Sequence, residues 1–108
     1  MKQYMIWYQK PHEVADSYFE RDIYVSELTD THAFVATIEA ENLERVFFMM
    51  NDPYGEGLNP LATEIGQRIV VDTEVLHTSM SVNDVVLDVE TGIYYRVAGA
   101  GFVKLINA

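Results

Sequence analysis

Residues that could perform nucleophilic or acid–base chemistry gather in one short stretch of the chain. The stretch contains a histidine, two serines and an aspartate: His77, Ser79, Ser81 and Asp84. A serine nucleophile needs a histidine base and an orienting acid, but three-dimensional geometry rather than adjacency in sequence makes a catalytic triad. The glycines that flank a nucleophilic serine at a strand-to-helix elbow are missing. We therefore predict no catalytic residues here.

The same stretch has the composition of a capped turn. Ser81, Asn83 and Asp84 occur together just before an apolar run, and the side chains of Ser, Asn and Asp bond readily to nearby backbone groups. We predict a turn that leads the chain into a strand at Val85. A small-ligand or enzymatic pocket beside this turn, with His32 across from it, stays open as an alternative.

The three histidines do not have the spacing of a metal site. His12, His32 and His77 lie 20 and 45 residues apart, whereas paired ligands on one helix face recur at i,i+3 or i,i+4. The sequence has no cysteine, which excludes disulfides, thiolate zinc sites and iron–sulfur clusters. Gly99-Ala100-Gly101 has too few glycines for a phosphate-binding loop. We predict neither a metal nor another cofactor.

The acidic balance of the sequence narrows the classes of partner. The 108 residues include 17 Asp and Glu against 7 Lys and Arg, a formal charge of -10. Binding to nucleic-acid phosphates takes Lys and Arg, so we expect no direct contact with nucleic acid. With 49% apolar residues, the chain should fold as one domain over 1–108. No apolar run approaches the ~20 residues of a membrane span or the ~7–15 of a signal peptide, which predicts a cytoplasmic protein without a membrane partner.

The acidic excess is concentrated in the first half of the chain. Residues 11–56 hold 11 acids against Arg21 and Arg45, a net charge of -9. Such a segment is either a solvated surface or a surface that meets a basic partner, whose association it would accelerate. Under the second hypothesis, the binding residues are six acids: Glu13, Asp16, Glu20, Asp22, Glu41 and Glu44.

The elements that must position these residues combine strands and helices. Apolar residues at 4–8 and an alternating pattern at 33–38 predict strands, the first of them inside a sheet. Helical spacing predicts the main helix over 40–51, ended by Asp52-Pro53. The remaining predicted elements are a short helix over 12–20, a loop over 52–60, a helical turn over 61–67, and strands over 68–71, 85–89, 93–97 and 102–106. Together they indicate an α+β fold, a small antiparallel or mixed sheet with one main helix packed on one face and a hairpin-rich C-terminal half.

The hairpin over 85–97 is predicted to turn at Glu90-Thr91-Gly92, because a three-residue loop with a final glycine suits a type I turn plus a bulge. That register places a wholly apolar set on one face: Val85, Leu87, Val89, Ile93, Tyr95 and Val97. The other face then carries Asp88 and Arg96 as diagonal neighbours.

The last third of the chain carries a pattern that resembles a known family. The pattern begins with His77-Thr78-Ser79-Met80-Ser81-Val82-Asn83-Asp84-Val85-Val86 and continues with Tyr94-Tyr95 and Gly101-Phe102-Val103-Lys104-Leu105. A His-Ser/Thr-x-Ser-Val-x-Asp-Val-Val turn, a short hairpin and a closing Gly-Phe-x-x-Leu make residues 77–105 similar to the YodL-like family. Relatives often have Gly where Asn83 stands, and Asn also tolerates a left-handed turn conformation.

The resemblance implies an accessory role and assigns no catalytic residues. Members of the YodL-like family tend to occur in plasmids and phages, alone or beside antirestriction-type and helicase domains. The resemblance therefore implies a protein that acts in the conflict between a mobile element and its host.

The sequence as a whole favours a small, acidic, non-enzymatic accessory protein of a phage or mobile element. Its partner would be a host protein with a basic surface, such as one that binds nucleic acid. A third hypothesis is a structural module that dimerises through a sheet edge or an apolar face, and either a monomer or a homodimer is compatible with the sequence.

Overall fold

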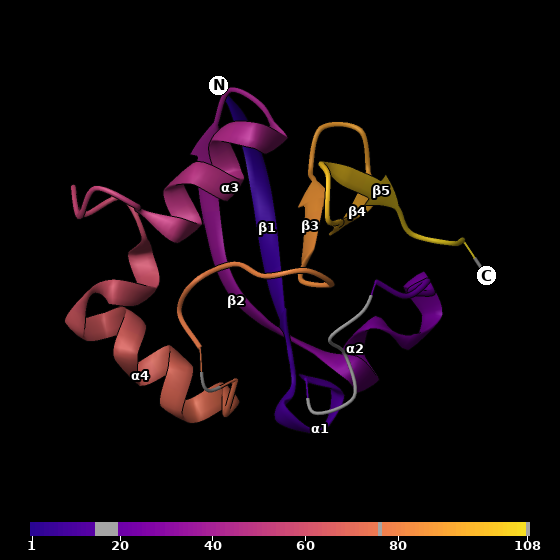
Figure 1. The fold of residues 1–108 in the computed structure, drawn as a ribbon, viewed down its shortest axis with the longest axis horizontal. Helices are drawn as coiled ribbons and strands as arrows, with labels where there is room; N and C mark the ends of the chain where they lie inside the picture. The colour runs from indigo at the N-terminus through magenta and orange to yellow at the C-terminus, as the bar shows by residue number, and fades with distance from the viewer. Residues whose placement is uncertain (15–19, 76, 108) are drawn as a thin grey trace.

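Five strands form one antiparallel sheet in the computed structural model, which describes residues 1–14, 20–75 and 77–107 (Figure 1). The strands follow the order β2-β1-β3-β4-β5 across the sheet. Their bounds are Lys2–Gln9 for β1, His32–Ala40 for β2, Val85–Asp88 for β3, Ile93–Val97 for β4 and Phe102–Lys104 for β5. Together with the helices described below, this sheet confirms the predicted α+β class.

Strand β1 lies inside the sheet, between β2 and β3. It pairs with β2 along its whole length and with β3 over residues 4–7. Tyr4, Ile6 and Tyr8 are buried on one face, and Trp7 packs into a second cluster on the other face. Because hydrophobic clusters cover both faces, the strand is apolar on both, which confirms the predicted internal strand.

Helix α3 spans Leu43–Asn51 and packs on the face of the sheet that carries Tyr4 (Figure 1). It begins after the predicted start at residue 40, because Ala40 is the last residue of β2. The side chain of Asn42 accepts a hydrogen bond from Arg45 N at 2.8 Å and so caps the helix. The helix ends at the predicted place, where Asp52 has a left-handed backbone.

Helix α4 spans Glu64–Thr73, so the predicted strand over 68–71 is wrong. Thr63 caps the helix by accepting a hydrogen bond from Gly66 N at 3.0 Å. A Cβ on Gly66 would lie 2.1 Å from the carbonyl oxygen of Pro60, so glycine allows the helix to approach the preceding turn. Two residues of the run then pack against the core, and this tertiary contact overrides the β propensity of a short branched stretch.

The remaining helical segments are short. Helix α1 spans Pro11–Val14 and helix α2 spans Leu28–Thr31, while single 3-10 turns span Val25–Glu27 and Pro60–Ala62. The helix predicted over 12–20 is therefore present at its start, and residues 15–19 lie outside the described residues.

The β3–β4 hairpin differs from its predicted register. Asp88 pairs with Ile93, so the turn contains four residues rather than the predicted three. The Asp88 carboxylate accepts hydrogen bonds from Glu90 N at 3.0 Å and Thr91 N at 3.3 Å, which favours the longer turn. Asp88 consequently shares a face with Ile93, and the face predicted to be wholly apolar carries this carboxylate. Arg96 lies on the opposite face.

The face of the sheet opposite α3 and α4 is partly covered by residues 20–31 and by the end of the chain. Tyr24 and Ile106 join these two segments through a parallel bridge. The ring of Phe34 packs against Trp7 with centroids 5.5 Å apart, yet Phe34 remains 44% exposed. The buried members of this second cluster are Ile23, Leu28, Val85 and Leu105.

Candidate functional site

The Asp84 carboxylate lies at the centre of the turn formed by residues 77–84, referred to below as the 77–84 turn. Asp84 is wholly buried, and its Oδ1 accepts a hydrogen bond from Gln9 N at 2.9 Å. Its Oδ2 accepts hydrogen bonds from Ser81 N at 2.9 Å and from His77 Nε2 at 3.2 Å. A buried carboxylate needs paired charge and hydrogen bonds, and these groups supply both.

One ring nitrogen of His77 faces Asp84, and the other ring nitrogen faces a backbone carbonyl. Its Nδ1 lies 2.7 Å from Val75 O, and because a carbonyl oxygen only accepts, Nδ1 carries a proton. When the ring is protonated, Nε2 also donates to the carboxylate, and the two side chains form an ion pair. Burial alone would lower the pKa of His77, but the hydrogen bond and charge of Asp84 and the carbonyl of Val75 raise it overall. The ring also stacks on Tyr8, with centroids 4.6 Å apart.

Two buried side chains connect the 77–84 turn to the sheet. The Tyr8 hydroxyl donates to Thr78 O at 2.8 Å, and burial raises the pKa of Tyr8 well above its usual range. His32 Nε2 donates to Asn83 O at 2.7 Å, since the carbonyl oxygen can only accept. Asn83 has a left-handed backbone with φ 73°, as the sequence allowed.

The structure brings together most of the polar residues singled out near this turn. His77 contacts Asp84, and His32 contacts the neighbouring residue of the turn. Ser81 reaches Asp84 through its backbone N–H, and Ser79 is exposed. The hydrogen bond from Asp84 N to Ser81 O at 3.0 Å confirms the predicted turn. The bonds described above hold that turn against the sheet rather than forming a nucleophile, base and acid in series, and the alternative pocket there stays a prediction.

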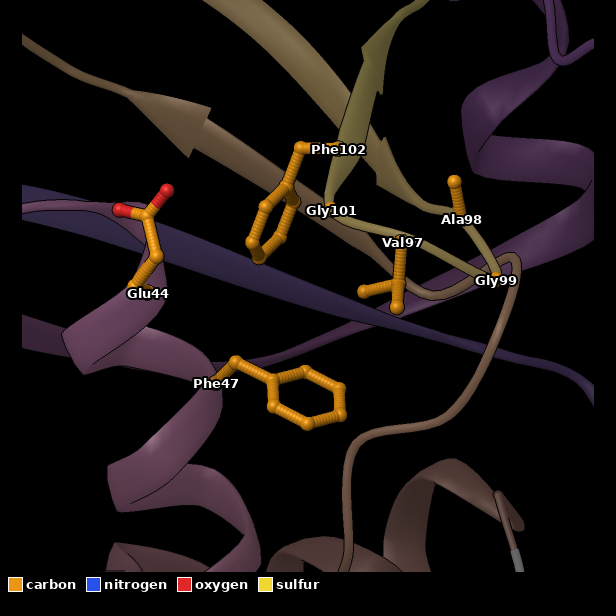
Figure 2. A pocket seen from close by; sticks show the side chains of 7 residues that line it. All are labelled: Glu44, Phe47, Val97, Ala98, Gly99, Gly101 and Phe102. Atoms are coloured by element: carbon orange, nitrogen blue, oxygen red, sulfur yellow. The ribbon is translucent and has the colours of Figure 1, made fainter.

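A cleft of about 250 Å³ lies between α3 and the β4–β5 hairpin (Figure 2), and we refer to it as the α3–β5 cleft. Figure 2 shows the rings of Phe47 and Phe102 and the side chain of Val97 around this space. Apart from one glutamate, its lining is apolar or glycine: Glu44, Phe47, Val97, Ala98, Gly99, Gly101 and Phe102.

One wall of the α3–β5 cleft exists because α3 turns an aromatic residue away from the core. The helical spacing of apolar residues in the sequence allows either Val46 or Phe47 on the buried face of this helix. Val46 and Met50 are wholly buried, whereas Phe47 is 38% exposed. Phe47 therefore presents its ring beside the core rather than inside it.

The opposite wall comes from the short connection between β4 and β5. Ala98 N donates a hydrogen bond to Gly101 O at 2.9 Å, which closes this connection tightly. Gly101 has φ 82°, a conformation that favours glycine. Because Gly99 and Gly101 have no side chains, this wall leaves room beside Val97 and Phe102 (Figure 2).

Carboxylates from two distant segments border the α3–β5 cleft. Glu44 lines it from the first turn of α3. Glu20 lies next to it, since a Cβ on Gly99 would be 3.4 Å from Glu20 Oε2. Glu20 Oε1 also accepts a hydrogen bond from Arg96 Nη1 at 3.2 Å, and Asp22 Oδ1 lies 3.9 Å from Arg96 Nη2. Two carboxylates therefore share one guanidinium, which lies on the face of β4 opposite Val97 and the cleft.

The fold thus gathers part of the acidic set predicted from the sequence. Glu44 lines the α3–β5 cleft and Glu20 lies beside it at Gly99. Asp22 lies by Arg96 on the other face of β4, and Glu41 is exposed just before α3. Asp16 and the side chain of Glu13 lie outside the described residues.

Sequence reasoning missed the apolar part of this cleft. Phe102 packs against the main cluster, but its ring also lines the cleft. The available signal was Phe47, an aromatic residue at the edge of the apolar stripe of a helix. Which side of that edge faces solvent depends on the roll of α3 over the sheet.

Acids in the interior have cationic partners, whereas acids at the surface are in excess. Among residues whose burial is described, Asp84 and Asp88 are the buried acids, paired with His77 and Lys2. Burial alone would raise the pKa of Asp88, but the Lys2 ammonium and two backbone N–H groups of the following turn lower it overall. Apart from the half-buried Asp52, the other acids in this part of the chain are exposed.

Comparisons with protein-family models, curated proteins and solved structures find no match to this chain. Within the described residues, no group of three or more metal-ligating side chains is placed to hold a metal ion. The same part of the chain contains no helix with the length and apolarity needed to cross a bilayer. The similarity of residues 77–105 to the YodL-like family stays a prediction.

Proposed function

We propose that this protein is a small acidic accessory protein of a phage or mobile element, which binds a basic surface of a host protein in the cytoplasm without catalysing a reaction. The placement of charge carries this proposal. The buried carboxylates have cationic partners, whereas the exposed carboxylates outnumber the remaining Lys and Arg. The excess of negative charge is therefore available to a partner.

The α3–β5 cleft supports the proposal with a specific place on that surface. Glu44 is exposed there, and Glu20 lies against Gly99, which also lines the cleft. Exposed charges attract an oppositely charged partner over about 8 Å at physiological salt, which accelerates association and selects basic surfaces. A host protein that binds nucleic acid presents such a surface.

A pull-down from host lysate with two charge-reversal variants tests this proposal. The first variant is Glu41→Lys/Glu44→Lys, at the start of α3. The matched control is Glu64→Lys/Asp72→Lys on α4, which changes the net charge equally at exposed positions. We expect the parent and the control to retain a basic host protein at low salt and to release it at high salt. Equal retention by both variants, or retention that high salt does not weaken, would contradict the proposal.

A second candidate function is dimerisation through the partly covered face of the sheet. Phe34 is 44% exposed beside Trp7, and exposed aromatic patches mark interaction surfaces. If this face joins two copies, light scattering gives the mass of a dimer, and Phe34→Glu lowers it to that of one chain. A monomeric parent protein removes this candidate.

A further inference from the structure

We infer that the α3–β5 cleft holds one apolar side chain of a partner protein, with lysine or arginine residues on either side of that side chain in the partner's sequence. This inference rests on the proposed function and specifies the kind of segment that the acidic surface would bind. It follows from the volume, the lining and the charges of the cleft.

The volume of the cleft suits a single side chain. Pockets for small-molecule ligands commonly measure roughly 300–1,000 Å³, whereas the cleft measures about 250 Å³. An apolar protein cavity of roughly 150 Å³ is known to hold benzene. The cleft therefore has room for a phenyl ring or a branched aliphatic side chain, together with part of its backbone.

The lining offers apolar contact on two sides. Phe47 is 38% exposed on α3, and Figure 2 shows the Phe102 ring of β5 across from it, with Val97 between the two elements. A side chain inserted here would cover aromatic surface that the fold leaves exposed. Buried aromatic and aliphatic anchors of this kind dominate the binding energy of protein interfaces.

The charges at the two ends of the cleft select the residues beside the anchor. Glu44 and Gly99 lie at opposite ends of the lined space in Figure 2, and Glu20 lies against Gly99. Glu20 shares the Arg96 guanidinium with Asp22 on the other face of β4, so two carboxylates meet one cation and a negative charge remains beside Gly99. A cation on each side of the partner's apolar residue would therefore meet a carboxylate at each end.

Among the residues that the structure describes, the nearby cations do not line this cleft. The Arg45 guanidinium of α3 lies over the ring of Phe48, 5.0 Å from its centroid. Lys104 shares the face of β5 with Phe102 because residues two apart in a strand point the same way, but the lining residues do not include it. The carboxylate of Glu44 is exposed and can therefore bind a cation of the partner.

Three synthetic peptides provide the probe for a binding experiment. In each peptide, two arginines precede a central residue and two arginines follow it, and the central residue is Phe, Leu or Ala. Titration into the isotope-labelled protein at low salt is followed by NMR chemical shifts. We expect the Phe and Leu peptides to bind roughly tenfold tighter than the Ala peptide, the ratio that burial of one apolar side chain provides. The amide signals that move should belong to the two walls of the cleft: Phe47, Ala98, Gly99, Gly101 and Phe102.

Two variants with matched controls locate the binding. Phe47→Ala should abolish the preference for Phe over Ala, whereas Ile65→Ala, which removes a 73% exposed apolar side chain on α4, should retain it. Glu44→Gln should weaken all three peptides by a similar factor, and Glu64→Gln on α4 should not. All four substituted side chains are exposed, so the NMR spectrum of each variant should show an intact fold.

The outcomes separate this inference from the function on which it rests. If the three peptides bind equally, or if Phe47→Ala retains the preference, the inference is overturned while charge-driven binding still stands. If the lysate experiment fails but the Phe peptide binds in the cleft, the inference holds and the proposed host partner is wrong. If no peptide binds at low salt, the inference is overturned whatever the lysate shows.

Discussion

The 77–84 turn and the α3–β5 cleft use carboxylates and aromatic rings in opposite ways. In the turn, the Asp84 carboxylate is wholly buried and bonded through both oxygens, and the Tyr8 ring is covered by His77. At the cleft, the Glu44 carboxylate is exposed and the ring of Phe47 is 38% exposed. In the turn, the polar groups bond to one another and hold the fold, whereas in the cleft a carboxylate and an aromatic ring both remain available to a partner. Residue type alone therefore does not mark a functional site.

The largest expected effect comes from removing the carboxylate of the turn. Asp84→Ala leaves Gln9 N, Ser81 N and the Nε2 of His77 without their partner. Breaking a buried charge pair in this way typically costs about 3–5 kcal/mol of unfolding free energy. Urea denaturation checks the value, with Glu64→Ala on α4 as an exposed control that should change stability by less than about 0.5 kcal/mol. A similar cost for both variants would mean that the turn is not a structural cluster.

A smaller effect should follow from His77→Phe, and it should depend on pH. Phe keeps a ring against Tyr8 but removes the bonds to Asp84 and Val75, which costs about 1.5–3 kcal/mol while the imidazole is charged. The pKa of His77 is raised above the 6.5 of an unperturbed histidine. Its contribution to stability is therefore complete below pH 6.5 and is lost as pH rises through the folded-state pKa. Urea unfolding between about pH 5 and pH 9 should show the two proteins converging at the alkaline end. A constant difference over that range would contradict the charged pair.

Truncating the aromatic wall of the cleft should affect stability less. Because Phe47 is 38% exposed, Phe47→Ala should lower the unfolding free energy by about 1 kcal/mol or less. Met50, one turn along the same helix and wholly buried, is the reference, and Met50→Ala should cost about 2–5 kcal/mol. Thermal or urea unfolding distinguishes the two. Equal costs would place Phe47 in the core and remove the basis for a free cleft.

The smallest effect on stability is expected for the acid at the mouth of the cleft. Glu44 and Glu64 are both acids in the first turn of a helix, where a negative charge contributes about 0.3–1 kcal/mol through the helix dipole. Glu44→Gln and Glu64→Gln should therefore destabilise the protein equally, while only the first weakens binding of the arginine peptides. A stability difference well above about 1 kcal/mol between them would show that Glu44 has a structural role.

Much of the fold could be predicted from the sequence where local pattern and tertiary packing agree. Strand β1 and strand β2 lie where the apolar patterns indicated, and α3 ends at Asp52 as expected. The prediction failed at residues 68–71 because a short branched run has the same composition in a strand and on the buried side of a helix. It failed in the hairpin because the Asp88 side chain bonds to the turn and lengthens it.

The candidate site was less accessible to sequence reasoning than the fold. The acidic surface could be located by counting, and the 77–84 turn by its Ser, Asn and Asp. The α3–β5 cleft combines residues from α3, from the β4–β5 connection and from the segment around Glu20. No local pattern links these segments, because their contact depends on strand order and on the roll of α3 over the sheet.

The sequence by itself determined the α+β class, the excess of acid in residues 11–56 and the capped turn that precedes β3. These properties follow from composition and from local periodicity, which act over a few residues. Only the tertiary structure decided which carboxylates are buried with a cation and which stay exposed beside an apolar cleft. Burial and pairing are set by contacts between segments distant along the chain. Among the described residues, the acids therefore divide into two that are buried beside Lys2 and His77 and hold the fold, and a larger, mostly exposed set that is available to a partner.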